Sequence, residues 1–418
     1  MDRGFLFLKI ACFFLVSAPV LSSIFFLLSG IISLKKNEEN YFQNNWNYPF
    51  LICTIFLIIS YSVSNLLLKN DSLPTGNYLS LVGLFNWIPF FVFFWLVQIY
   101  LKNPKKREAI IISYIVGSIP QIISGLGQLW FGWEGPIGIA NNLIIWFQRP
   151  ISQGMGITGV FNNANYAGIW YVMLMPMCIA CFIESKNSSK KKLFIFILLI
   201  LISYSLILTK SRNALLNGFL SLVFLNQNIH LLGLLIFFVF LGFVLYFLIN
   251  PLSMLVKGSF FVNLKSIIYD SEFISELKYN LQRFEIWPAA IKFISEKPLL
   301  GWGASSFPVL YNTNNEKMFI THSHNLFLEL AISYGMPAAI IFTSTIILIL
   351  YRSFIKIYFK DNNYFEKAWW IVAFTLFVSH LFDILYFDIR ISISFWLFLA
   401  GLVNIIREKK HYSVSENI

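Results

Sequence analysis

Long apolar runs dominate the chain, and polar residues are confined mainly to the short segments between these runs. Most of the runs approach or exceed the roughly 20 residues that an α-helix needs to cross a lipid bilayer. The pattern therefore predicts an all-α, polytopic membrane protein. The runs lie at about 50–68, 79–101, 109–130, 159–183, 193–208, 213–226, 231–249, 324–350, 368–386 and 391–406.

The first apolar run, residues 4–34, is too long for one comfortable span and is interrupted by Pro19. Two alternatives are a signal peptide cleaved near Ser17 and Ala18 and one long span. The apolar pattern resumes directly after Pro19, which favours a retained segment over a cleaved one. Basic residues stand at both ends of the run (Arg3, Lys9, Lys35, Lys36). Because both ends then favour the cytoplasm, we expect a helical hairpin that turns near residues 17–19. The total is then about twelve transmembrane helices.

Composition supports this class of protein. Hydrophobic residues make up 57% of the chain, charged residues 12%, and the mean hydropathy is +0.70, whereas soluble proteins have roughly 25% charged residues. The net charge of +11 lies largely in short loops, where lysine and arginine set topology, so it does not indicate nucleic-acid binding. The four cysteines all lie in apolar runs, and we interpret them as small buried side chains.

Clusters of lysine and arginine assign the loops to the two sides of the membrane. The basic segments are predicted to face the cytoplasm together with both termini, and they lie at 102–107, 186–192, 352–367 and 407–410. The intervening loops then face the other side, and they lie at 131–158, 209–212, 250–323 and 387–390. We expect a single integral membrane domain over residues 1–418.

The loop at 250–323 is by far the longest connection. Within it, residues 273–297 carry apolar side chains at helical spacing, which predicts one or two amphipathic helices on the outer surface with a break near Pro288. The apolar positions are Leu277, Leu281, Phe284, Trp287, Ile291 and Ile294. Because structured loops of this length usually serve function, we expect a functional role for this loop.

Ionisable residues collect on the predicted outer face, where residues near membrane depth are candidates for function. His322 and His324 directly precede an apolar run, Arg283 lies in the amphipathic segment, and Lys210 and Arg212 join two runs. Each has a structural alternative, since a histidine can cap a helix and a basic side chain can extend to the membrane interface.

Four further charged residues on this face receive a structural interpretation. Asp383, Asp388 and Arg390 are expected to form ion pairs, and Arg149 is expected to be an ordinary loop charge.

The functional candidates suit chemistry on a phosphate. Arginine binds phosphate oxygens in pairs and stays charged, and histidine can accept a proton near neutral pH. Two arginines and one histidine would therefore suffice for glycosyl transfer from a lipid-linked diphosphate. No acidic cluster suggests a divalent metal, so no metal or other cofactor is expected. A transporter of a small anion, with the arginines along its path, is the alternative from another class.

Four stretches resemble the O-antigen ligase and O-antigen polymerase superfamily of bacterial inner-membrane glycosyltransferases. The stretch TGVFNNANYAGIWYVMLMP (158–176) is similar to the family's Gly-x-Phe-x-Asn-x-Asn motif, and TKSRNALL (209–216) to its Ser-Arg motif. RFEIWPAAIKFISEKPLLGWGASSF (283–307) resembles the signature of the large loop, and HSHNLFLELAISYGMPAA (322–339) the His-Asn signature that closes it.

The resemblance implies about twelve helices with a periplasmic loop folded over the site, and an inverting, metal-independent transfer. The donor would be a glycan on undecaprenyl diphosphate and the acceptor a sugar hydroxyl, such as one on lipid A core. By position, His324 matches the family's base, and Arg212 and Arg283 match the arginines that hold the diphosphate. Asn325 is expected to orient the base or contact substrate, and His322 and Lys210 to contact substrate.

The same resemblance leaves the acceptor open. A polymerase would join repeat units on two lipid carriers, a ligase would transfer a finished chain to lipid A core, and a third outcome is transfer onto protein. The residues do not distinguish these, and we favour the ligase. The resemblance places the protein in the inner membrane with the active site periplasmic, while the charge pattern places both termini in the cytoplasm.

Overall fold

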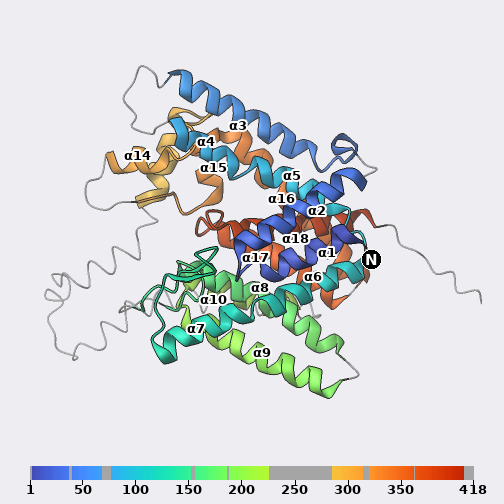
Figure 1. Ribbon diagram of the computed structural model, residues 1–418. Helices are drawn as coiled ribbons and strands as arrows, with labels where there is room; N and C mark the ends of the chain where they lie inside the picture. Colours follow the sequence, from blue (N-terminus) through green and yellow to red (C-terminus); the bar gives the residue numbers. More distant parts are fainter. Residues whose placement is uncertain are drawn as a thin grey trace, which may run out of the picture.

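The computed structural model describes residues 2–36, 40–67, 77–151, 156–185, 188–225, 285–313, 320–361 and 363–408. Within them the chain is an all-α bundle whose only sheet pairs two three-residue strands, β1 (Ile137–Ile139) and β2 (Ile144–Trp146) (Figure 1). The helices are α1 (Arg3–Phe14), α2 (Pro19–Lys36), α3 (Tyr48–Leu67), α4 (Asn77–Phe85), α5 (Ile88–Gln98), α6 (Pro104–Gly117), α7 (Ile119–Phe131), α8 (Ala164–Glu184), α9 (Ser189–Leu208), α10 (Arg212–Leu225), α14 (Phe307–Thr313), α15 (Leu326–Tyr334), α16 (Met336–Lys356), α17 (Tyr364–His380) and α18 (Ile389–Arg407).

Seven helical segments in the described part of the chain are long and apolar enough to cross a membrane. They are Pro19–Lys36, Leu81–Gln98, Pro104–Phe131, Ala164–Glu184, Ser189–Leu208, Met336–Phe359 and Ile389–Arg407. Two shorter apolar helices, Tyr48–Ser64 and Arg212–Leu225, accompany them. The all-α, multi-pass class is thereby confirmed. The run predicted at 231–249 lies outside the described residues, so the count of about twelve stays a prediction.

The N-terminal hairpin is confirmed. Helices α1 and α2 pack side by side, and the hydroxyls of Ser22 and Ser29 donate to the carbonyls of Ala11 (2.7 Å) and Gly4 (2.9 Å). Small side chains allow this close approach, and the hydroxyls satisfy groups that lipid could not.

Parts of three of the four basic segments predicted to share one face, at 102–107, 352–367 and 407–410, meet at one end of the bundle. Asp2 forms ion pairs with Lys36 (3.0 Å) and Lys106 (3.5 Å). The buried Arg107 binds Glu366 and Glu408, each at 2.7 Å. The ends of α2 and α18 and the starts of α6 and α17 therefore lie together with both ends of the described chain. That this face is cytoplasmic stays a prediction.

Several apolar runs are broken in the structure by proline. The pairs α4–α5, α6–α7 and α15–α16 each split one run, and Pro89, Pro120 and Pro337 stand in the first turn of the second helix. At the last break Gly335 has φ +89°, and a Cβ there would lie 2.1 Å from the Leu299 carbonyl oxygen. The chain therefore kinks after α15, and the kink needs glycine at this position.

Two details of the prediction are wrong. Residues 285–296 are helical without interruption, so the break near Pro288 does not occur, and Ile291 is 59% exposed although it was grouped with the apolar face. The buried positions are instead Ile286, Ala290, Phe293 and Ile294, at spacings of four, three and one, which still makes the helix amphipathic. The part of the predicted loop at 250–284 lies outside the described residues.

The second error concerns the run at 368–386. Helix α17 ends at His380, and residues 381–388 form a non-helical connection to α18, here called the 381–388 loop. The apolar residues Ile384 and Leu385 of this loop are buried without being helical, so their hydrophobicity extended the run beyond the true helix end. Asp383 consequently lies in a loop on the same side as the 320–325 segment, which leads into α15.

Candidate active site

The 320–325 segment and the 381–388 loop are held together at the start of α15. Asn325 caps this helix, because its side-chain oxygen accepts from the Leu328 amide (3.1 Å). Its amide nitrogen donates to the Leu381 carbonyl (3.1 Å). Both polar ends of the Asn325 side chain are therefore engaged within the protein, and this residue fixes the distance between the two loops.

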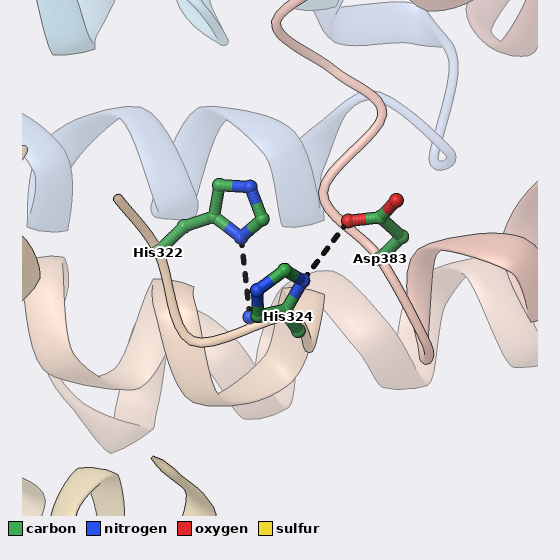
Figure 2. A group of neighbouring side chains, drawn as sticks. All are labelled: His322, His324 and Asp383. Atoms are coloured by element: carbon green, nitrogen blue, oxygen red, sulfur yellow. Dashed lines mark hydrogen bonds and ion pairs between the residues drawn. The ribbon is translucent and has the colours of Figure 1, made fainter. Parts of the chain in front are cut away.

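His324 points at Asp383 across this junction (Figure 2). Its Nδ1 lies 3.1 Å from Asp383 Oδ1, and the two side chains are 27% and 8% exposed. The ring nitrogen Nε2 has no hydrogen-bond partner among the described residues. A neutral imidazole that donates from Nδ1 to a carboxylate keeps the lone pair of Nε2 available. This is the arrangement of a carboxylate-oriented general base.

The carboxylate of Asp383 has two further donors. Its Oδ1 accepts from the Ile384 amide (2.9 Å), and its Oδ2 accepts from the Asn165 side chain (2.8 Å). Burial alone would raise the pKa of Asp383, but the hydrogen bond and charge of His324, with smaller help from His322 and the Ile384 amide, hold this pKa at about 2. The carboxylate is therefore ionised at every physiological pH.

A hydrogen-bond chain continues from Asp383 to the start of α10. The hydroxyl of Ser211 donates to the side-chain oxygen of Asn165 (2.8 Å) and also accepts from the Ala214 amide (3.3 Å), which caps α10. Arg212 is the first residue of this helix and is exposed. The chain Ser211–Asn165–Asp383–His324 thus connects the segments at 158–176, 209–216 and 322–339 in one site.

The other predicted residues lie around this chain. Lys210 is exposed, with φ +53°, in the turn between α9 and α10. Arg283 lies outside the described residues. The ring of His322 lies 4.2 Å from that of His324, and its Nδ1 accepts from the His324 amide (3.3 Å). His324 itself has φ +54°, a conformation that residues other than glycine seldom adopt and that often marks functional positions.

The large-loop signature packs against the same segment. The indole of Trp287 donates to the Ser323 carbonyl (3.2 Å). The amides of Trp302 and Gly303 donate to the carbonyls of Ile332 (2.7 Å) and Ser333 (3.0 Å). Gly301 and Gly303 have φ +66° and +96°, so the Gly-Trp-Gly turn needs both glycines to reach the end of α15.

One group in the described part of the chain could hold a metal ion. A ligand atom from each of His322, His324 and Asp383 lies within 4.8 Å of the others. Two imidazoles and one carboxylate form a ligand set that suits zinc and similar transition metals. The expectation that the reaction needs no metal stays a prediction.

The acidic residues of the 381–388 loop have different roles. Asp388 pairs with Arg390 through three side-chain contacts of 2.5–3.2 Å, and Arg390 lies over the Phe161 ring at 3.7 Å. The structural interpretation of this pair is confirmed. Asp383 was wrongly grouped with it, because it pairs with His324. Arg149 is exposed, and only its backbone is hydrogen-bonded in the described contacts.

Two residues of the site were missed from the sequence. Asn165 lies in the Gly-x-Phe-x-Asn-x-Asn motif but was given no role. Glu329, on α15, is 4% exposed and accepts from the Ser323 amide (2.9 Å) and hydroxyl (2.8 Å) with Oε2. A lone carboxylate inside an apolar run was the signal that could have drawn attention to Glu329.

Two comparisons with known proteins concern the segments that form this site. Residues 194–343, which include Arg212, His322 and His324, match a family model described as O-antigen ligase. A protein from Acinetobacter baylyi described as a ComP-specific O-oligosaccharyltransferase is 25% identical over 416 residues, covering 92% of this chain and 71% of the relative. The family match covers the Ser-Arg turn, the 285–313 segment and the histidine segment that the hydrogen bonds and packing bring together. The chain is thus similar to the O-antigen ligase family over residues 194–343, and to an O-oligosaccharyltransferase over most of its length.

Proposed function

We propose that the protein transfers a glycan from undecaprenyl diphosphate to a sugar hydroxyl on lipid A core, at the periplasmic face of the bacterial inner membrane. His324 acts as the general base. Its Nε2 takes the proton of the acceptor hydroxyl while Asp383 accepts the hydrogen bond from Nδ1 and stabilises the imidazolium that forms.

The acceptor oxygen attacks the anomeric carbon as the bond from that carbon to the phosphate oxygen breaks. The electron pair of this bond leaves with undecaprenyl diphosphate. A single displacement of this kind inverts the configuration at the anomeric carbon. Arg212 and Arg283 stabilise the charge that develops on the diphosphate, which is the role a metal ion plays in other transferases.

The observation that carries this proposal is the hydrogen-bond chain from His324 through Asp383 and Asn165 to Ser211. It ties the base to the residue directly before Arg212 by contacts of 2.8–3.1 Å. A base and an anion-binding arginine must keep a constant separation to act on one substrate, and this chain supplies such a constraint.

Two other acceptors fit the same chemistry. A polymerase would use a second lipid-linked repeat unit. A third acceptor is a hydroxyl on a protein, and the relative from Acinetobacter baylyi, described as a ComP-specific O-oligosaccharyltransferase, keeps this outcome open. An anion transporter finds no similar support, since the family match and the relative both point to glycan transfer.

The test is a reconstituted reaction with purified protein in detergent and a glycan on undecaprenyl diphosphate. Lipid A core, a second lipid-linked repeat unit and a hydroxyl-bearing acceptor protein are offered in separate reactions. We expect product with one acceptor, and a loss of rate of at least 10²-fold for His324→Ala, the size of a general-base contribution. The control is His411→Ala, the same substitution at a histidine in the C-terminal tail, and the rate should not change. Full activity of the folded His324→Ala protein would overturn the mechanism.

A further inference from the structure

A small cavity lies next to the histidine segment. It has a volume of about 100 Å³ and is bounded by the α4–α5 junction, residues 304–308, α15 and the end of the 381–388 loop. Thr321, directly before His322, forms part of its wall. The ring of Phe387, also in the wall, lies 6.0 Å from that of His322. The cavity and the candidate base therefore share one loop.

A buried carboxylate faces this cavity with one oxygen unused by the protein. Glu329 lines the cavity, and its Oε2 is held by Ser323. Its Oε1 has no hydrogen-bond partner among the described residues. Because Glu329 lines the cavity and its Oε1 is not used by a described protein donor, a hydroxyl-bearing ligand in the cavity could donate a hydrogen bond to this oxygen.

The remaining walls combine aromatic rings with small polar groups. Trp87 and Tyr386 pack with ring centroids 4.7 Å apart, and Phe387 is 51% exposed at the margin. Asn86 and Ser305 add polar side chains. Aromatic surfaces beside a few placed polar groups are typical of sites that bind and orient a small ligand, and a sugar ring presents both apolar C–H faces and hydroxyl donors.

We infer that this cavity binds one pyranose ring of a substrate, with Glu329 Oε1 accepting a hydrogen bond from a ring hydroxyl and Phe387 packing against a C–H face. The volume is well below the roughly 300–1,000 Å³ of drug-sized sites, which limits the occupant to a single ring. The inference rests on the proposed function for the identity of the substrates. The ring belongs either to the donor glycan or to the acceptor.

The first test compares Phe387→Ala with Ile389→Ala in the reconstituted reaction. The two side chains are 51% and 49% exposed and two residues apart, but only Phe387 lines the cavity. We expect Phe387→Ala to raise one KM about tenfold, equivalent to about 1.4 kcal/mol, with kcat within twofold. A rise in the donor KM assigns the ring to the donor, and a rise in the acceptor KM assigns it to the acceptor. Ile389→Ala should change neither.

The second test is Glu329→Gln, which retains an oxygen for Ser323 and removes the charge. The same KM should rise about tenfold. Unchanged KM values in both folded variants would overturn the sugar site, as would a fall in kcat alone for Glu329→Gln, because Glu329 would then only fix the histidine segment. Activity of His324→Ala refutes the proposed function by a separate measurement, so the two failures are distinguishable.

Discussion

Replacement of Asp383 by asparagine tests whether the carboxylate orients His324 or only stabilises the loop. The carboxylate receives hydrogen bonds from His324, Asn165 and the Ile384 amide. An asparagine of the same shape can keep one oxygen acceptor, but its NH₂ group would face either His324 or Asn165. Opposite His324, it would donate to Nδ1 and move the ring proton to Nε2, where the proposed reaction needs a lone pair.

The structure sets the size of the effect. The pKa of Asp383 is lowered from 3.8 to about 2, which corresponds to about 2 kcal/mol of preference for the ionised form in the folded protein. A base in the wrong tautomer loses its general-base contribution, so kcat should fall by about 10²–10⁴-fold. The donor KM should change little, because Asp383 contacts His324 and Asn165 rather than the substrate.

The assay is the initial rate of glycan transfer with the donor saturating, per amount of monodisperse protein. Asp388→Asn is the matched control, because Asp388 is an equally buried carboxylate of the same loop that pairs with Arg390. Both substitutions are compared per folded molecule, and the kcat of Asp388→Asn should stay within a few-fold of wild type. A kcat for Asp383→Asn within threefold of wild type would refute the orienting role.

The pH dependence of stability gives an independent check. The folded pKa of Asp383 lies below the unfolded value, so its contribution to the free energy of unfolding is fully present above about pH 5 and is lost as pH falls toward 2. The difference in Tm between wild type and Asp383→Asn should therefore be constant from pH 5 to 7 and should shrink below pH 4. A difference that grows on acidification would contradict the assigned pKa.

Two further predictions concern the surroundings of the pair. Asn165→Ala removes one donor to Asp383 and the link to Ser211, so kcat should fall about tenfold although His324 is retained. The control Asn163→Ala removes only the cap of α8 and should lower Tm more than kcat. Equal losses of kcat in the two variants would show that the link through Asn165 has no specific role. Zn²⁺ should inhibit by binding His322, His324 and Asp383, and EDTA should restore full activity; a loss of activity in EDTA alone would show instead that a metal is required.

The sequence predicted the architecture well where local physics decides it. Basic residues at both ends of the 4–34 run indicated a helical hairpin. The side chains of Ser22 and Ser29 fit the close packing of its two helices. These features depend on span length, charge and backbone conformation, all of which are encoded within a few residues.

The site was less accessible from sequence because its contacts join distant segments. Asp383 lies 59 residues from His324 and 218 from Asn165, and no periodicity reports which loops meet. Because apolar residues follow Asp383, the predicted run continued past the true end of α17, and Asp383 was grouped with Asp388 and Arg390. Its pairing with His324 depends on the 381–388 loop folding back over the start of α15.

The hydrogen-bond chain also explains why the motif segments need not contact one another through their most reactive residues. Asn325 joins the start of α15 to the 381–388 loop, and Asn213, next to Arg212, donates to the Ser379 carbonyl at the end of α17 (3.1 Å). Both ends of the hydrogen-bond chain are thus attached to the C-terminal end of α17, at the carbonyls of Ser379 and Leu381. In the proposed reaction this attachment lets Arg212 stay exposed toward a diphosphate while its helix start remains fixed relative to the base. Precise placement of the base relative to this helix start then comes from neutral asparagines and serines.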